Sequence, residues 1–448
     1  MDRLAGTRAA STDSARRIGA HRRRGRYLRA ACAAAAVTLA VGACSSSDDG
    51  SGSSTAASSS GTSVAASSTG MLPIGNADLQ SLVESTAKEL MLPGVVVLLR
   101  TPTGDQTVTY GTTERDGGAP VSLDDHIRVG SNTKTWTGTV ILQQVQEGKI
   151  ALADPVSKYR PDVPGGDGIT IEQLLNMRSG LFNYSETLEL NEALDQDPQK
   201  VWTPDQLLAL AFAHPPYFPP GQGYHYSNTN FVLLGLIAEQ LDGKPLQQVF
   251  EQRLFGPLGL ANTLFPDTNA LPAPNSHGYM FGTNVQTMTD PALPAEMQAA
   301  AKAGTLAPND VTDDNPSWAW SAGSGISTAN DLATWVQDLA GGKALDAQMQ
   351  AVRMAAFQPT DPSKPDGPEY GLAMAKMGPL YGHTGELPGY NSFMGSDPDS
   401  GVTLVVWANL APAANGQDPA SGIAKTIVDE MFPPASAPSP TSAPTPTS

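Results

Sequence analysis

The chain has 448 residues, of which 40% are hydrophobic and 16% charged, and its formal net charge is −17. This length suits one large domain or two ordinary ones. The negative charge argues against nonspecific nucleic-acid binding, because phosphate backbones select basic surfaces. The sequence has no His-Glu-x-x-His motif and no paired Cys/His spacing, so we expect no metal and no cofactor.

The first 43 residues have the organisation of an export signal. Arginines are concentrated in residues 16–29, and residues 30–43 are apolar and small. An apolar run of about 14 residues is too short to span a bilayer as a mature helix. The run ends in Val-Gly-Ala-Cys, the form of a bacterial lipobox, which would leave Cys44 as a lipidated N-terminus. We therefore predict secretion, by Sec or Tat, and a lipid anchor on the outer face of the membrane. The alternative is an ordinary cleaved signal with a chance cysteine.

Two low-complexity segments flank one predicted globular domain. Residues 44–74 are rich in Ser, Gly, Thr and Ala and predict a flexible tether, and residues 434–448 form a Pro/Ser/Thr-rich tail. The domain between them covers residues 75–433. Both cysteines, Cys32 and Cys44, precede this domain, so its stability must come from core burial rather than from a disulfide.

Within the domain, strand patterns occur near both ends and helical patterns occur between them. This arrangement predicts an α+β fold, in which one antiparallel sheet with flanking helices meets an all-helical subdomain and the active site lies in the cleft between. The predicted strands are residues 95–100, 107–110, 389–396 and 402–408. The predicted helices are residues 76–90, 171–175, 204–213, 230–240, 246–254 and 423–431, with another helix beginning near residue 131.

That last helix opens with the strongest chemical signal in the chain. Residues 129–138 place Ser131 three positions before Lys134, directly after a Val-Gly pair. Positions i and i+3 share one face of a helix, so the hydroxyl and the amine can meet as nucleophile and general base. Free backbone N–H groups at the start of the helix favour developing negative charge. A second Ser-x-x-Lys, residues 85–88, lies in the middle of the first helix, and we interpret it as surface.

Two later segments carry further candidate side chains. Tyr226 and Asn228 form a Tyr-x-Asn triplet before an apolar helix, with the phenol and the amide pointing the same way. Residues 382–386, Gly-His-Thr-Gly-Glu, begin a strand-rich segment. In the structural alternative, Tyr226 and Asn228 only cap the following helix, and His383 is a strand histidine without substrate contact.

These three elements, in this order and behind a secretion signal, resemble the motifs of the serine β-lactamase and penicillin-binding protein superfamily. The Tyr-x-Asn triplet is similar to that of class C β-lactamases and D-alanyl-D-alanine carboxypeptidases. His-Thr-Gly resembles the variant of Lys-Thr-Gly found among peptidases and esterases of the family. The resemblance covers residues 75–433 and implies a β-lactamase/DD-peptidase-like fold.

The resemblance also implies a role for each matching residue. Ser131 would attack a carbonyl and become acylated, Lys134 with a lowered pKa would be the base, and Tyr226 would relay the proton to the leaving group. The implied substrate-binding residues are Asn228, His383, Thr384 and Gly385, and the implied oxyanion hole consists of the backbone N–H groups of Ser131 and Glu386.

Two departures from the family pattern bear on the substrate. His383 replaces a lysine, and a histidine is only partly charged at neutral pH, which weakens binding of the carboxylate that β-lactams and peptide termini present. Arg178 stands in a Met-Arg-Ser-Gly-Leu segment where the family often shows His-Thr-Ser-Gly-Leu. No arginine that would clamp a terminal carboxylate is evident.

Three functional hypotheses follow. The first is a lipid-anchored serine hydrolase that acts through an acyl-enzyme on D-alanyl peptides, as a D-alanyl-D-alanine carboxypeptidase. The second is an esterase or amidase, or a weak β-lactamase, on the same fold. The third is a non-catalytic member that binds peptidoglycan or a partner protein, and the intact set of Ser131, Lys134, Tyr226 and Asn228 counts against it. We expect a monomer.

Overall fold

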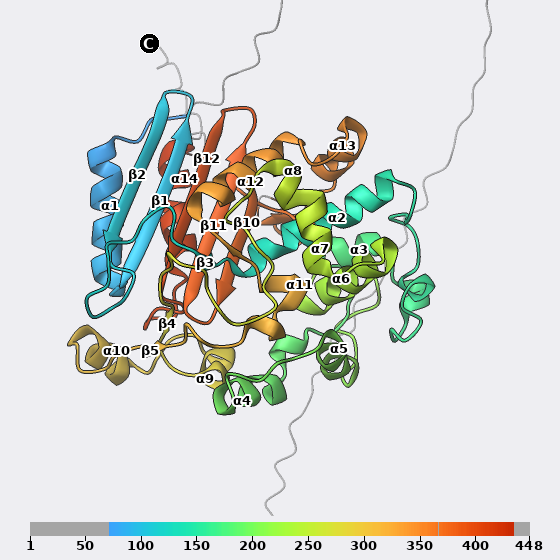
Figure 1. Cartoon of the computed structure of the whole chain (residues 1–448), viewed down its shortest axis with the longest axis horizontal. Coiled ribbons are helices and arrows are strands. Elements are labelled where there is room, and N and C mark those ends of the chain that lie inside the picture. The colour runs from blue at the N-terminus through green and yellow to red at the C-terminus, as the bar shows by residue number, and fades with distance from the viewer. Residues whose placement is uncertain (1–70, 366, 434–448) are drawn as a thin grey trace, which may run out of the picture. The chain divides into compact units, whose positions relative to one another are not determined.

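The computed structural model describes residues 71–365 and 367–433 (Figure 1). The predicted signal segment, Cys44, nearly all of the tether and the C-terminal tail lie outside the described residues. The first and last helices, α1 (Asn76–Leu90) and α14 (Pro419–Met431), fall inside the predicted domain. Within the described part, no helix combines the length and the apolar character that a membrane span requires.

An antiparallel sheet of eight strands organises the fold, in the order β2-β1-β12-β11-β10-β9-β8-β7. The N-terminal hairpin pairs with the last strand, so that Val95 lies opposite Ala408. The two ends of the domain therefore meet in one sheet, as predicted. The strands are β1 (Gly94–Thr101), β2 (Gly104–Gly111), β7 (Gln358–Pro359), β8 (Glu369–Tyr370), β9 (Ala375–Met377), β10 (Leu380–Leu387), β11 (Tyr390–Asp397) and β12 (Val402–Ala408).

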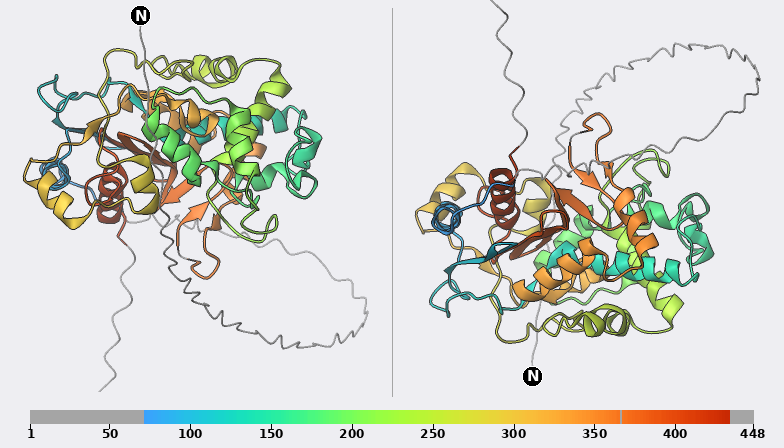
Figure 2. Two further views of the ribbon diagram at one scale, coloured as in Figure 1. Left: turned by 90° about the horizontal axis from the view of Figure 1, so that it is seen from below. Right: turned by 90° about the horizontal axis from the view of Figure 1, so that it is seen from above.

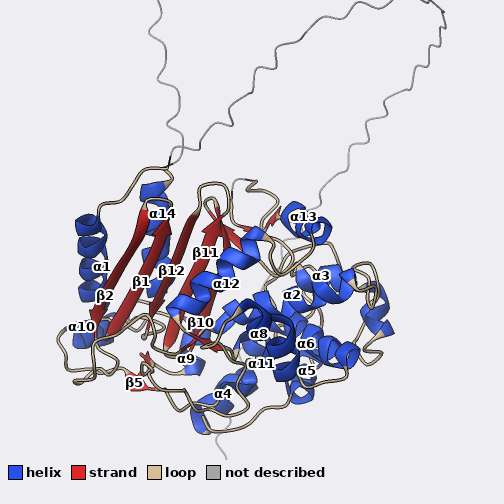
Figure 3. Cartoon of the chain, turned by 45° about the horizontal axis from the view of Figure 1, so that its top comes forward, coloured by secondary structure: helices blue, strands red, loops and turns tan. Residues whose placement is uncertain are grey.

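Helices cover both faces of this sheet, which is why its central strands are apolar at nearly every position. Helices α1 and α14 pack on one face, and α12 (Ala329–Gly341) packs on the other (Figure 3). Successive side chains of a strand point to opposite faces. Val95, Val97 and Leu99 of β1 accordingly join the core under α1 and α14, whereas Val96 and Leu98 join the core under α12.

The helices of the middle of the chain gather beside the sheet (green in Figure 2). Helix α2 (Thr133–Gln146) runs through their centre and is buried along most of its length, because α6, α11 and β10 pack against it. The other helices of this part are α3 (Ile171–Leu175), α4 (Leu188–Gln196), α5 (Pro204–Phe212), α6 (Asn228–Asp242), α7 (Leu246–Phe250), which continues into the π-helical turn Glu251–Phe255, α8 (Gly256–Leu258) and α11 (Trp320–Gly323).

The remaining elements connect the two parts and complete the α+β arrangement predicted from the sequence. Two short ladders pair β3 (Ile127–Arg128) with β6 (Ile326–Ser327) and β4 (Tyr279–Met280) with β5 (Asn309–Asp310). Three further helices are α9 (Asn284–Thr289), α10 (Ala295–Lys302) and α13 (Ala347–Ala355). The structure thus confirms the predicted fold class.

Candidate active site

Ser131 lies in a short 3₁₀ turn, Gly130–Asn132, that leads directly into α2. Gly130 has a φ of +55°, and a Cβ atom at this position would lie 2.3 Å from the backbone nitrogen of Glu386. Glycine is therefore required for the turn to approach β10. The Nδ2 of Asn132 donates to the Val129 carbonyl at 3.1 Å and fixes the turn from behind.

The close approach of the turn to β10 also explains why residue 385 is a glycine and how the two N–H groups of the predicted oxyanion hole come together. A Cβ atom at Gly385 would lie 1.9 Å from the Val129 carbonyl oxygen, so this glycine lets β10 pack directly on the turn. The packing brings the backbone of Glu386 against the turn that carries Ser131. The two N–H groups predicted to stabilise an oxyanion come from these adjacent segments, one at a helix start and one on a strand.

Lys134 is fully buried, and all its hydrogen-bond partners are uncharged. Its Nζ contacts the Oγ of Ser131 at 2.9 Å, the Oδ1 of Asn228 at 2.7 Å and the carbonyl of Ala322 at 2.7 Å. Burial lowers the pKa of the Lys134 ammonium well below its usual range. A neutral amine can accept the Ser131 hydroxyl proton and still donate to the other two oxygens. The predicted nucleophile and base therefore meet in the required geometry.

The Tyr226 hydroxyl is buried and has no hydrogen-bond partner among the described residues. Its ring centroid lies 4.7 Å from the Nζ of Lys134. Burial raises the pKa of the Tyr226 phenol, which therefore stays protonated at neutral pH. A protonated phenol beside the nucleophile is placed to give a proton to a leaving group rather than to remove one.

His383 is buried and turned towards Tyr370 rather than towards the nucleophile. Its Nδ1 lies 2.6 Å from the Thr384 carbonyl and must carry a proton, because a carbonyl only accepts. Its Nε2 then accepts from the Tyr370 hydroxyl at 3.1 Å. Burial lowers the pKa of His383 to about 3, so the ring is neutral rather than partly charged.

A cleft of about 380 Å³ opens over Ser131. Ser131, Tyr226, Asn228 and Glu386 line it, whereas His383, Thr384 and Gly385 do not, so a substrate-binding role for these three stays a prediction. No Lys, Arg or His is among the described residues that line the cleft, but two carboxylates are, those of Glu186 and Glu386. The lining also has an apolar part, which includes Leu190, Leu194, Met280, Met288, Trp318 and Leu387.

Glu186 is a site residue that the sequence analysis missed. A chain of hydrogen bonds links it to Lys134 through Asn228. The Nδ2 of Asn228 donates to the Oγ of Ser185 at 3.0 Å, Ser185 donates to the Oδ1 of Asn183 at 3.1 Å, and the Nδ2 of Asn183 donates to Glu186 at 3.1 Å. The turn that follows the Ser-Gly-Leu segment, residues 183–186, thus supports the predicted substrate-binding amide. The run of Asn, Ser and Glu in this turn is the feature of the sequence that could have indicated this part of the site.

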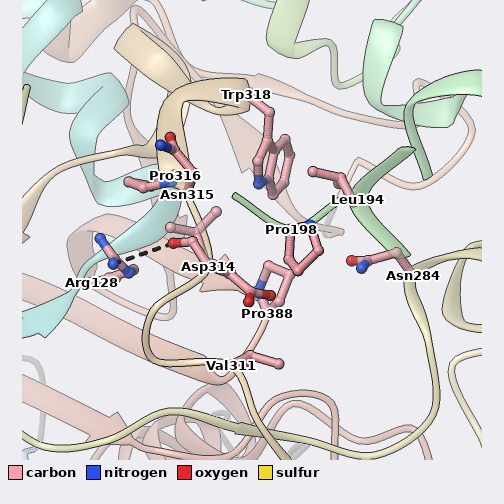
Figure 4. Close-up of a pocket in the computed structure, with 11 residues that line it drawn as sticks. Arg128, Leu194, Pro198, Asn284, Val311, Asp314, Asn315, Pro316, Trp318 and Pro388 are labelled. Carbon is pink, nitrogen blue, oxygen red and sulfur yellow. Dashed lines mark hydrogen bonds between the residues drawn. The ribbon is translucent and has the colours of Figure 1, made fainter. Parts of the chain in front are cut away.

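A second, smaller cavity adjoins the cleft and shares with it Leu194, Asn284, Trp318, Leu387 and Pro388 (Figure 4). Arg128 lies at its edge and donates to the carbonyls of Asn269 at 2.6 Å and Thr312 at 3.0 Å. The cavity measures only about 20 Å³, which is room for about one water molecule. Arg128 therefore holds two loops together, and it does not line the cleft over Ser131.

Arg178, the other departure from the family pattern, lies away from the nucleophile. It donates to the Pro359 carbonyl at 2.9 Å, and its guanidinium lies 5.8 Å from the Tyr224 ring centroid. It therefore ties the helical part to β7. No group of three or more His, Cys, Asp or Glu side chains placed to hold a metal occurs in residues 71–365 and 367–433.

A serine hydrogen-bonded to a buried lysine of lowered pKa, next to a protonated phenol and against a strand of an antiparallel sheet, defines the active site of a serine hydrolase of the penicillin-recognising kind. The family model described as Beta-lactamase matches residues 79–426. The chain therefore belongs to the β-lactamase family.

Relatives and solved structures agree with this assignment. The chain is 26% identical over 334 residues to the putative penicillin-binding protein PbpX of Bacillus subtilis, covering 74% of each protein. A D-stereospecific amidohydrolase from Streptomyces sp. superposes with a TM-score of 0.66 and 31% identity, covering 79% of this chain and 98% of the other. A D-amino acid amidase from Ochrobactrum anthropi gives a TM-score of 0.67 and 25% identity, covering 80% and 97%.

Proposed function

We propose that this serine hydrolase is an amidohydrolase that forms an acyl-enzyme at Ser131 and cleaves amide bonds of small D-amino-acid or D-peptide substrates. The observation that carries the proposal is the contact of 2.9 Å between the Ser131 hydroxyl and the buried amine of Lys134. A serine with a neutral base at hydrogen-bond distance is an activated nucleophile.

The order of proton transfers in the reaction follows from the side chains of Ser131, Lys134 and Tyr226. Lys134 takes the Ser131 hydroxyl proton as Oγ attacks the amide carbonyl, and the N–H groups of Ser131 and Glu386 stabilise the oxyanion. Tyr226 gives its proton to the departing nitrogen, the C–N bond breaks, and the Lys134 ammonium reprotonates the phenolate. Water then attacks the Ser131 ester, Lys134 accepts its proton, and return of that proton to Oγ restores the enzyme.

The lining of the cleft favours an amidase over a carboxypeptidase. A carboxypeptidase or a β-lactamase must hold a substrate carboxylate, which calls for a cationic side chain. The described lining residues include no such side chain and include Glu186 and Glu386. The names of the two solved relatives, a D-stereospecific amidohydrolase and a D-amino acid amidase, support the same choice.

A D-alanyl-D-alanine carboxypeptidase is the second candidate. Its support is the names of relatives such as PbpX and penicillin-binding protein 4* of Bacillus subtilis. An esterase activity is compatible with either candidate, because an ester is a more reactive acyl donor for the same nucleophile.

One set of assays on the full chain separates these candidates. We expect turnover of p-nitrophenyl acetate and of D-alaninamide, both abolished by Ser131→Ala, with little release of D-alanine from an acetylated D-alanyl-D-alanine peptide. Faster cleavage of that peptide than of the amide would establish the carboxypeptidase. Stable labelling by a fluorescent penicillin would support it further. A well-folded protein that is silent in every assay would leave the non-catalytic binding role.

We also propose that the enzyme is secreted and tethered to the outer face of the membrane through a lipid on Cys44, and that it is a monomer. The support is the Arg-rich, apolar segment ending in Val-Gly-Ala-Cys. Fractionation should place the wild-type chain with membranes and Cys44→Ala in the soluble fraction. Equal recovery of both chains with membranes would contradict lipidation. The molar mass from light scattering tests whether the chain is a monomer.

A further inference from the structure

Glu186 presents a fixed negative charge at the rim of the cleft. The Tyr217 hydroxyl donates to its carboxylate at 2.6 Å, Asn183 donates at 3.1 Å, and the Nε2 of His225 lies at 3.0 Å. Burial opposes ionisation, but these hydrogen bonds outweigh it, and the pKa of Glu186 is lowered. About four lone-pair sites are available on a carboxylate, so one further donor can bind.

This carboxylate belongs to the same rigid wall as the catalytic groups. The hydrogen bonds through Asn183, Ser185 and Asn228 connect it to Lys134, and both Glu186 and Ser131 line one cleft. Because every link is a short direct contact, the distance from Glu186 to the nucleophile is set by the fold rather than by a mobile side chain.

No described lining residue neutralises this charge from across the cleft. The pKa of the second lining carboxylate, Glu386, is raised by desolvation of its carboxyl group and by the neighbouring Asp418, although the residue as a whole is exposed, so it is a weaker anion than Glu186. The other lining side chains are apolar or uncharged and polar, such as Asn191 and Asn284. The cleft thus offers one ionised acceptor, several aliphatic surfaces and no charged donor of its own.

We propose that Glu186 binds the free α-ammonium group of the substrate. The substrate class is then amino-acid amides and short peptides with an unblocked amino terminus. The apolar lining residues of the cleft contact the substrate side chain. This inference rests on the proposed amidohydrolase function. It makes Glu186 the residue that selects amine-bearing acyl donors over acylated ones.

The experiment compares two amides that differ only in the amino group, D-phenylalaninamide and 3-phenylpropanamide, on the full chain. For Glu186→Gln, which keeps the size of the side chain, we expect the ratio of their kcat/KM values to fall roughly tenfold or more, mainly through a higher KM for the amine. The matched control is Glu189→Gln. Glu189 is exposed on α4 and does not line the cleft, so the ratio should stay at the wild-type value.

Each other outcome has a distinct meaning. An equal loss on both amides in Glu186→Gln would overturn the inference and assign Glu186 to holding the turn. Wild-type preference for 3-phenylpropanamide would overturn it as well. Ser131-dependent cleavage of 3-phenylpropanamide without any cleavage of D-phenylalaninamide would spare the proposed amidohydrolase and remove the ammonium site. Absence of Ser131-dependent turnover of every amide would refute the proposed function itself.

Discussion

The chain contains the Ser-x-x-Lys pattern twice, and the two copies lie in different surroundings. In α1, Lys88 is 61% exposed at its side chain and forms an ion pair with Glu84 at 3.0 Å. The hydrogen bond to Glu84 raises the pKa of Lys88. Ser85 next to it donates to the carbonyl of Leu82. This copy is ordinary helix surface, as expected from its position in the middle of a helix.

The copy at Ser131 has the same spacing in an opposite environment. Lys134 is buried without a carboxylate partner, so its charged form is disfavoured, and its amine points at the serine hydroxyl. The difference between a surface lysine and a general base thus lies in burial and in uncharged partners supplied by α6 and α11.

The largest expected effect separates the two copies directly. Ser131→Ala and Lys134→Met should each lower kcat/KM for an ester or amide by roughly 10³-fold or more, because nucleophile and base are lost. Ser85→Ala and Lys88→Met should stay within about twofold. The measurement is steady-state kinetics with a melting curve for each variant. A similar loss at both copies would contradict the distinction.

Tyr226→Phe removes a hydroxyl that is buried and without a partner among the described residues. We expect kcat to fall by about 10²- to 10⁴-fold as proton donation to the leaving group is lost. The melting temperature should stay the same or rise, since a buried unsatisfied group is removed. Tyr224→Phe is the control, because its hydroxyl does not line the cleft. Unchanged kcat in Tyr226→Phe would remove Tyr226 from the mechanism.

The backbone contact that places Ser131 can be broken without replacing a reactive side chain. Gly130→Ala puts a methyl group 2.3 Å from the Glu386 nitrogen at a φ of +55°. We expect a loss of roughly 1–3 kcal/mol of stability and a fall in kcat. Gly422→Ala in α14, where a Cβ meets nothing within 4 Å, should be neutral or slightly stabilising. Denaturant unfolding of both variants tests whether glycine is required at position 130. Equal free energies of unfolding for the two variants would refute this requirement.

A smaller effect concerns pH. The folded pKa of His383, about 3, lies below its ordinary value of 6.5, so the unfolded state binds the proton more tightly. The stability due to neutral His383 is therefore complete above pH 6.5 and is lost as the pH falls towards 3. His383→Gln should flatten this slope relative to wild type in unfolding curves at several pH values. Identical slopes would show that the ring is not held neutral.

Local signals made some of this structure predictable. The contact of Ser131 with Lys134 follows from i, i+3 spacing, and the strand-like residues 95–100 and 107–110, separated by a Thr-Gly-Asp turn, predicted the hairpin that became β1 and β2. The helix start at Asn228 falls two residues before the predicted one, because the apolar pattern begins only later.

The unpredicted features depend on contacts far apart in the sequence. Glu186 reaches the site through a folded turn, and the orientation of His383 is set by Tyr370 on a strand of two residues. Strands β7, β8 and β9 have two or three residues, too few to show alternation. The lowered pKa of Lys134 follows from burial, which no local sequence pattern records.

The most direct test of this account is to measure the pKa of the two lysines by NMR on protein with ¹³C-labelled lysine, with Lys134→Arg and Lys88→Arg to assign the signals. The account predicts that Lys88 titrates above its ordinary value of 10.5 and Lys134 well below it. Titration of both near 10.5 would mean that Lys134 is charged at neutral pH and would contradict its role as the base for Ser131.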